Sequence, residues 1–247
     1  MLRIANATIG YPRHEVASGI DLEIEPGDVI ALVAPNGSGK TTLLKALSGK
    51  GRTLQAGEVD VDGTAPGRSR VYSRKVFFAS PGDSPLVSEM TLREHLTTIA
   101  ELWEHECDAA AISKRAGVEG LLNIKVKRMS QGMRQLSVIA CALATDADYL
   151  LFDEPLNGLD LLKARAATHL LGELACEGKG LVVSSHIFAG LEDVATELAF
   201  LTPTGLQIHP TTADWQRLFV RTYRKEETPS SAADIYPTTP KHWRHHD

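Results

Sequence analysis

A run of small and polar residues separates two apolar stretches near the start of the sequence. Residues 31–47 read ALVAPNGSGKTTLLKAL, an apolar strand pattern followed by a glycine-rich loop and a helix pattern. A plain strand-to-helix connection needs no such concentration of glycine. Glycine lets the backbone adopt positive φ and approach a ligand closely, and a helix start presents unpaired N–H groups to an anion. The segment therefore predicts a strand, a phosphate-binding loop and a helix, in that order.

The loop follows the spacing G-x-x-x-x-G-K-[ST], in which backbone N–H groups surround phosphates. Lys40 is expected to reach the outer phosphates, and the Thr41 hydroxyl is expected to hold Mg²⁺. Ala34 replaces the first glycine of the pattern, which costs about 1 kcal/mol or more if that position needs positive φ. The alternative, a glycine-rich structural turn, does not account for the Lys-Thr-Thr run at the helix start. The predicted phosphate-binding residues are Asn36, Gly37, Ser38, Gly39, Lys40, Thr41 and Thr42.

Two further apolar segments end in ionisable residues. YLLFDEP (149–155) contains Asp153 and Glu154, and GLVVSSH (180–186) ends in His186. Ligands of open α/β sheets bind beyond the carboxyl ends of strands, so these side chains are expected near the phosphate loop. Asp153 is expected to bind Mg²⁺, Glu154 to polarise a water aimed at the γ-phosphate, and His186 to hold that water. Taken singly, the Asp-Glu-Pro run also fits a strand-ending turn, and the histidine also fits a polar cap.

Composition narrows the class of protein. The chain has 247 residues and a formal net charge of −5, which gives no argument for nucleic acid as a partner. No apolar run reaches the roughly 18 residues of a membrane span. The first residues, MLRIANATIGY, alternate like a strand and lack the pattern of a signal peptide. The three cysteines are widely spaced, which favours a reducing, cytoplasmic setting over a disulfide framework.

Continuous apolar strands such as YLLF and LVVS are typical of a parallel sheet covered by helices on both faces. The pattern therefore predicts an α/β fold, with a helical region that begins at a capping box of Thr91 and Glu94. Strands are expected within 1–30 and over 57–63, 75–80, 148–155, 180–186, 197–202 and 205–210. Helices are expected at 39–48, within 91–127, and at 132–144, 159–177 and 187–194.

Two more motifs flank the acidic strand. MSQGMRQ (129–135) precedes it and EPLNGLD (154–160) overlaps its end. Together with the phosphate loop, these motifs make the chain resemble the ATP-binding subunit of ABC transporters over roughly residues 2–220. The resemblance implies a P-loop NTPase core with a mostly parallel sheet, an antiparallel β subdomain and a helical subdomain. The implied boundaries are 1–221 for the ATP-binding domain, about 91–145 for the helical subdomain and 222–247 for a mobile tail.

In that family, two ATP-binding domains pair head to tail, and each ATP lies between the phosphate loop of one and the signature motif of the other. The resemblance implies that Ser130, Gln131 and Gly132 contact ATP held by a second subunit, identical or related. It also implies that Tyr11 stacks on adenine and that Asp160 is the acidic residue of the D-loop. ATP and Mg²⁺ are the implied ligands.

The sequence departs from the family pattern at several positions. Besides Ala34, Gln131 and Met133 stand where the common signature has glycine and glutamine. The family usually has a Mg²⁺-contacting glutamine in the segment that here reads FFASPGDSPLVSEMTLREHL, which contains none. Ser80 and Asp83 are the candidates for the missing oxygen. This departure predicts weak basal ATPase activity in the isolated subunit.

The implied function is an ATP-hydrolysing subunit that powers translocation by separate transmembrane permease subunits. Export is the expected direction, and the cytoplasmic face of the cell membrane is the expected location. One alternative is a weakly active or non-hydrolysing partner in a heterodimeric transporter, which the missing glutamine favours. Another is a soluble ABC-type ATPase of DNA repair or ribosomes, a class that usually has coiled-coil insertions or two fused ATP domains. The sequence does not identify the cargo, because the membrane subunit selects it.

Overall fold

The computed structural model describes residues 1–67, 70–186, 190–212 and 214–224. The chain divides into two compact units, Met1–Ala213 and Asp214–Asp247. The second unit contains helix α7 (Trp215–Arg224), in which the rings of Phe219 and Tyr223 lie 4.7 Å apart. This helix continues past residue 222, where the tail was predicted to begin. The remainder of that predicted tail lies outside the described residues.

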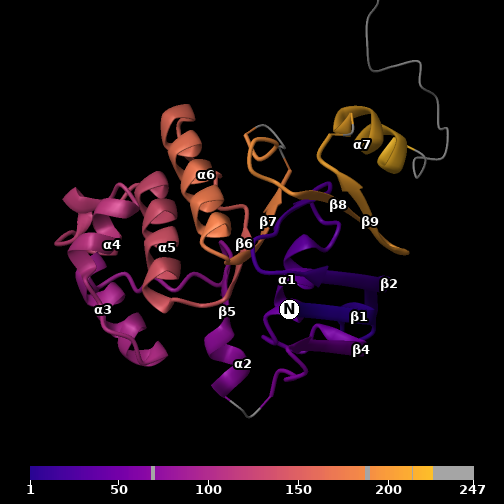
Figure 1. The fold of residues 1–247 in the computed structure, drawn as a ribbon, viewed down its shortest axis with the longest axis horizontal. Coiled ribbons are helices and arrows are strands. Elements are labelled where there is room, and N and C mark those ends of the chain that lie inside the picture. The colour runs from indigo at the N-terminus through magenta and orange to yellow at the C-terminus, as the bar shows by residue number, and fades with distance from the viewer. Residues whose placement is uncertain (68–69, 187–189, 213, 225–247) are drawn as a thin grey trace, which may run out of the picture. The chain divides into compact units, whose positions relative to one another are not determined.

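A sheet with mostly parallel strands forms the centre of the first unit (Figure 1). Among the described residues its strand order is β5-β6-β7-β3-β8-β9, and every neighbouring pair is parallel except the β8–β9 hairpin. Strands β3, β5, β6 and β7 are buried along their whole length, as their continuous apolar sequences predict. The strands are β3 (Val29–Val33), β5 (Val76–Ala79), β6 (Tyr149–Asp153), β7 (Gly180–Ser185), β8 (Glu197–Thr202) and β9 (Gly205–Pro210).

An antiparallel sheet of order β2-β1-β4 adjoins helix α1. Its strands are β1 (Leu2–Tyr11), β2 (His14–Ile24) and β4 (Leu54–Val61). One face is apolar and buried, because Leu2, Ile4, Ala7 and Ile9 point inward while the intervening residues are more exposed. This sheet is the antiparallel β subdomain that the sequence comparison with ABC subunits implied.

Helices α3, α4 and α5 form the helical subdomain, which Figure 1 shows as a group beside the main sheet. Helix α3 begins at the predicted capping box, because the Thr91 side chain accepts from the Glu94 N–H and the Glu94 side chain accepts from the Thr91 N–H. The helices of the first unit are α1 (Lys40–Leu47), α2 (Arg70–Lys75), α3 (Leu92–Trp103), α4 (Ala109–Arg115), α5 (Gln131–Thr145) and α6 (Leu161–Cys176), with 3₁₀ turns at Glu119–Leu121 and Val126–Arg128.

Two local expectations differ from the structure. Helix α2 was not predicted, because it is short and buries the aromatic residue Tyr72, whose hydroxyl donates to the Leu47 carbonyl. Burial raises the pKa of that hydroxyl above its ordinary range. A helix was predicted over 187–194; residues 187–189 lie outside the described residues, and residues 190–194 form turns. The tertiary contact of Tyr72, rather than local periodicity, therefore accounts for α2.

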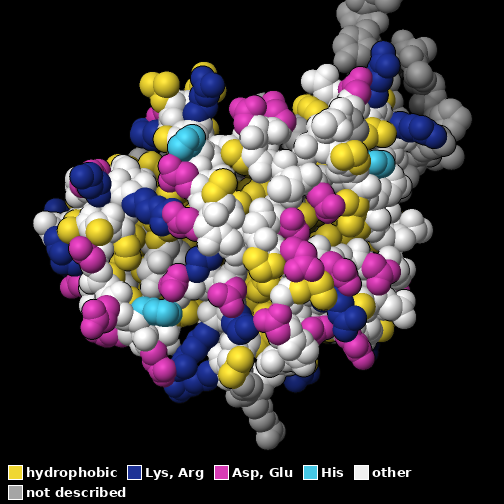
Figure 2. Space-filling model, in the orientation of Figure 1, with side chains coloured by type: hydrophobic (Ala, Val, Ile, Leu, Met, Phe, Trp, Pro, Cys, Tyr) yellow, Lys and Arg dark blue, Asp and Glu magenta, His cyan; other side chains and the backbone are white. Residues whose placement is uncertain are grey.

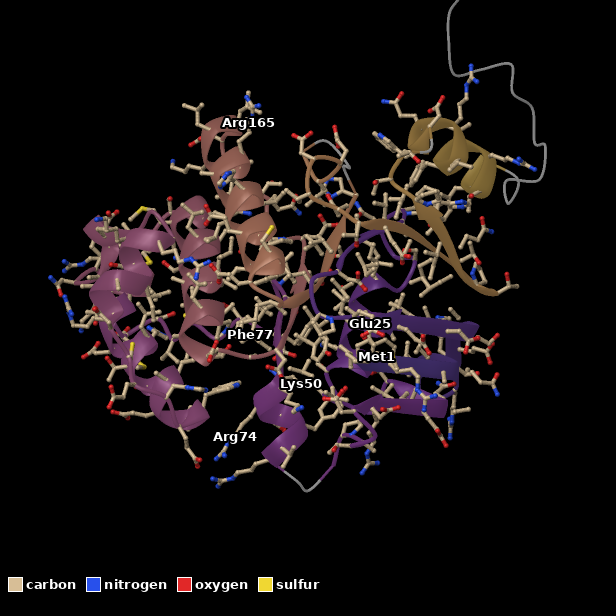
Figure 3. All side chains as sticks on the ribbon, in the orientation of Figure 1. Met1, Glu25, Lys50, Arg74, Phe77 and Arg165 are labelled. Atoms are coloured by element: carbon tan, nitrogen blue, oxygen red, sulfur yellow. The ribbon has the colours of Figure 1, made fainter. Side chains whose placement is uncertain are left out.

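The helical subdomain meets the main sheet at β5. Phe77, labelled in Figure 3, lies on β5, and its ring centroid is 5.9 Å from that of Phe152 on β6. On the visible face of the first unit, acidic and basic side chains are interspersed with small apolar areas (Figure 2). The sheet core is thus continuous up to the strand ends, where the polar side chains of the site begin.

Candidate functional site

The predicted phosphate loop connects β3 to α1. Gly37 and Gly39 have φ values of 81° and 101°, which favour glycine. A Cβ on Gly39 would lie only 2.2 Å from Cγ1 of Val16 on β2, so this position has no room for a side chain. Ala34 is fully buried and does not have a positive φ, so alanine at this departure from the motif causes no backbone strain. The loop therefore has the close-packed geometry that its sequence predicts.

Lys40 lies in the first turn of α1, and its ammonium group turns back over the loop. Its Nζ donates to the carbonyl oxygens of Ala34 at 2.8 Å and Pro35 at 3.2 Å. The same atom lies 3.6 Å from Oε1 of Glu154, and the lysine side chain is only 6% exposed. A buried ammonium is costly unless it is paired, so these contacts hold a positive charge at the mouth of the loop.

Asp153, at the end of β6, links the phosphate loop to β7. Its carboxylate accepts hydrogen bonds from Thr41 Oγ1 at 2.5 Å and Ser184 Oγ at 2.6 Å. Sequence reasoning placed Asp153 and Thr41 together but missed Ser184. Its signal was its position near the end of VVSS, one of the apolar strands already expected to reach the same sheet edge.

Glu154 has an unusual backbone and a bridging side chain. Its φ of 52° is in the left-handed region, and its N–H donates to the carbonyl oxygen and the hydroxyl of Ser184, at 3.2 and 3.0 Å. Its Oε2 lies 2.8 Å from Nδ1 of His186, while Oε1 faces Lys40. The structure thus brings Glu154, His186 and Lys40 together, as their positions at the sheet edge predicted. Strained backbone of this kind is common at functional sites.

The predicted signature residues lie at the start of α5. Ser130 is the N-cap of this helix and accepts from the Met133 N–H at 3.3 Å. The side chain of Gln131 covers Gly158, because a Cβ on Gly158 would lie 2.7 Å from Cδ of Gln131. Gly132 also packs closely on this loop, and its added Cβ would be 3.0 Å from the Gly158 oxygen. The two motifs therefore approach closely within one chain, and the φ of 79° at Gly158 favours glycine there.

Asp160 and Tyr11 were predicted to bind nucleotide from other elements. Asp160 caps α6 by accepting from the Lys163 N–H at 3.0 Å, and its side chain also pairs with the Lys163 ammonium at 2.7 Å. These hydrogen bonds hold the pKa of Asp160 below its ordinary value. Tyr11 is 45% exposed at the end of β1, next to the turn that leads into β2. The contact of Val16 with Gly39 places β2 beside the phosphate loop.

The two candidates for the missing glutamine occupy different surroundings. Ser80 directly follows β5 and is 5% exposed, and its hydroxyl oxygen has no hydrogen-bond partner among the described residues. It lines a cavity of about 460 Å³ together with Asp153 and Gln135. Asp83 is half-exposed and faces Lys45, with Oδ2 3.7 Å from Nζ. The cavity therefore favours Ser80 over Asp83 as the group available near Asp153.

In the described part of the chain, no helix is both long and apolar enough to cross a membrane. The same residues contain no cluster of three or more His, Cys, Asp or Glu side chains arranged to hold a metal ion by themselves.

Known proteins resemble both the sequence and the fold. The ABC transporter family model matches residues 17–157, more than half of the chain. The ABC transporter ATP-binding protein NatA of Bacillus subtilis (strain 168) is 36% identical over 176 residues, covering 68% of this chain and 70% of NatA. The Nod factor export ATP-binding protein I of Burkholderia thailandensis is 31% identical over 197 residues, covering 77% of this chain and 64% of that protein.

A solved structure of the ATP-binding subunit of an ABC transporter has a TM-score of 0.80 to this chain at 23% identity, covering 90% of this chain and 98% of that one. Fold and site together define an α/β phosphate-loop ATPase, and the chain belongs to the ABC transporter family. Within that family it is the ATP-binding subunit, which hydrolyses ATP to energise transport.

Proposed function

We propose that this chain binds Mg²⁺ and ATP at the phosphate loop, pairs head to tail with a second ATP-binding subunit, and drives export through transmembrane permease subunits. The observation that carries the proposal is the convergence of Lys40, Asp153, Glu154 and His186 at one edge of the sheet. They come from the ends of β6 and β7 and from the start of α1, so one phosphate chain can reach all of them.

Phosphate binding falls to the loop Asn36–Thr42. Its backbone N–H groups and the start of α1 offer donors to the phosphates, and Lys40 supplies a positive charge. The Ser38 hydroxyl is buried and has no partner among the described residues, which leaves a polar group that a nucleotide can satisfy. On binding, the ammonium of Lys40 exchanges the Ala34 and Pro35 carbonyls for phosphate oxygens, a stronger charge-assisted contact.

The site suits Mg²⁺. The Thr41 hydroxyl and the Asp153 carboxylate lie 2.5 Å apart, and such oxygen groups are the ligands that Mg²⁺ prefers. When bound, the ion neutralises part of the charge on the phosphates. Ser184 keeps the Asp153 carboxylate oriented by donating to its other oxygen. Ser80, which lines the same cavity as Asp153, is the additional oxygen group proposed for this region.

Hydrolysis is assigned to Glu154 and His186. The Glu154 carboxylate accepts the proton of the attacking water. His186, whose Nδ1 lies 2.8 Å from that carboxylate, holds the water in place and contacts the γ-phosphate. The start of α5 contacts the ATP held by the second subunit, because unpaired N–H groups at a helix start favour an anion. The residues that make this contact are Ser130, Gln131 and Gly132. Tyr11 stacks on adenine, and Asp160 lies at the interface of the two subunits.

The export direction rests on relatives. The Nod factor protein is an export ATP-binding protein by name, and its similarity extends over most of this chain. Association with permease subunits places this chain at the cytoplasmic face of the cell membrane, as a peripheral subunit. A weakly active partner subunit in a heterodimeric transporter stays a second candidate, because the segment after β5 has no glutamine.

ATP turnover by the purified chain tests the proposal. We expect Mg²⁺-dependent phosphate release that is weak in the isolated subunit, absent in Glu154→Gln, and accelerated by co-purifying permease subunits in vesicles. A wild-type chain that binds ATP but releases phosphate only slowly, with permease as well as alone, supports the weakly active candidate instead. Uptake of cargo into inverted vesicles, as opposed to right-side-out vesicles, checks the export direction.

A further inference from the structure

The first turns of α5 contact the loop that follows β6 at two separate places. Near the start of that loop, Gln135 Nε2 donates to the backbone oxygen of Glu154 at 3.0 Å. Further along, Gln131 and Gly132 pack on Gly158. Gln131 and Gln135 are four residues apart, so they lie on the same face of the helix. One face of α5 therefore follows the loop 154–158 from its first residue onward.

The backbone of Glu154 needs support from both sides. Its φ of 52° is unusual for a residue with a side chain, and such a conformation persists only when surrounding contacts fix it. On the amino side, the N–H of Glu154 is held by Ser184. On the carbonyl side, the oxygen accepts from the Asn157 N–H at 3.3 Å within the loop itself, and from Gln135. Gln135 is thus the side chain that ties the Glu154 carbonyl oxygen to another element, helix α5.

We propose that Gln135 is a positioning residue, which sets the direction of the Glu154 carboxylate by holding its backbone oxygen from α5. This inference rests on the proposed function, in which Ser130, at the N-cap of the same helix, contacts the ATP of the second subunit. A shift of α5 when that ATP binds is transmitted through Gln135 to the catalytic carboxylate of its own chain. The helix thereby connects the two ATP sites of the dimer.

The test compares Gln135→Leu and Gln135→Glu, which both remove the N–H donor, with Gln207→Leu, the same change at an exposed position of β9. In the wild type and each variant, we would measure kcat and KM for ATP. We expect the Gln135 variants to lose about 10- to 100-fold in kcat, because small displacements of a reacting group have such effects, with KM nearly unchanged. Unchanged kcat in both Gln135 variants would overturn the proposal.

Two further readouts separate positioning from folding and from the proposed function. In the Glu154→Gln background, Gln135→Leu should leave the ATP concentration that drives dimer formation unchanged; loss of nucleotide binding would show a structural role and overturn the proposal. Amide hydrogen exchange of the peptide spanning 153–160, in nucleotide-free protein, should be faster in both Gln135 variants and unchanged in Gln207→Leu. If hydrogen exchange of this peptide is the same in the Gln135 variants as in the wild type, the inference is overturned, and this readout does not depend on ATPase activity. Absence of ATPase activity in the wild type would instead count against the proposed function alone.

Discussion

Two loops leave the same edge of the main sheet and are built in opposite ways. The phosphate loop after β3 is tied to its neighbours through Lys40, Thr41 and the side chains of β6 and β7. The segment 80–90 after β5 is anchored mainly at its distal end, where the Val87 N–H donates to Nε2 of His95 at 2.7 Å. Its first part is exposed over Pro81–Ser84 and adjoins the cavity that Ser80 lines.

The difference separates a preorganised part of the site from an adjustable one. Few buried contacts and exposed backbone characterise segments that open locally at low free energy. The phosphate loop can therefore bind its ligand with its backbone already in place, by an exchange of the Lys40 contacts, whereas the segment 80–90 has the freedom to respond to a partner. We propose that this segment docks on the permease and completes the site when the permease orders it.

The largest effect is expected from Glu154→Gln. The amide cannot accept the proton of the attacking water, so phosphate release should fall by about 10²- to 10⁴-fold. Nucleotide binding relies on the phosphate loop and should persist, so MgATP should trap a dimer that size-exclusion chromatography detects. Wild-type turnover in this variant would refute the role of Glu154.

Lys40→Ala should have the next largest effect. Loss of a charge-assisted contact to phosphate should weaken nucleotide binding by about 1.5–3 kcal/mol, or roughly 10- to 150-fold in Kd. Titration with a fluorescent ATP analogue would measure this change. The control is Arg165→Ala on the outer surface of α6, labelled in Figure 3, which should bind like the wild type. Equal affinity in Lys40→Ala would place the phosphates elsewhere.

Stability should separate Ser184 on β7, which supports the Asp153 carboxylate beside the phosphate loop, from Ser80 at the start of the segment 80–90. Ser184→Ala removes hydrogen bonds to Asp153 and to the Glu154 N–H, so the free energy of unfolding should fall by about 1–3 kcal/mol. Ser80→Ala removes a buried hydroxyl without a described partner, so the free energy of unfolding should change by less than about 1 kcal/mol or rise. Urea unfolding compares them directly. A larger loss in Ser80→Ala would show that its hydroxyl is bonded in solution.

The smallest effect is expected from Asp83→Asn. The ion pair with Lys45 is long, at 3.7 Å, and half-exposed, so its loss should change the free energy of unfolding by less than about 0.5 kcal/mol. Hydrogen exchange over 80–90 should nevertheless quicken, because this pair links the segment to α1. If hydrogen exchange over 80–90 is as slow as that of the phosphate loop, in the wild type or in Asp83→Asn, the two loops do not differ as described.

The sequence predicts the part of the site that is local. The phosphate loop, the buried parallel strands and the convergence of Asp153, Glu154 and His186 follow from spacing and from the rule that strand ends share an edge. The expected sheet edge included Ser184, but its hydrogen bonds to Asp153 and Glu154 depend on which strand lies beside β6. Gln135 could not be found in this way, because its role depends on which helix face covers the next loop. Helix α2 escaped prediction for the same reason, since its burial depends on one tertiary contact of Tyr72.

In the proposed function, where Tyr11 stacks on adenine, the close approach of Val16 to Gly39 has a consequence for nucleotide selectivity. It fixes the spacing between the end of the β1–β2 hairpin, where Tyr11 lies, and the phosphate loop. A ligand that reaches both points behaves as a chelate, because its second contact forms at the high effective concentration set by a rigid spacer. Adenosine or triphosphate alone engages one end only and gains no such advantage. A bulkier residue at 16 would lengthen the spacer and weaken the whole nucleotide more than either fragment.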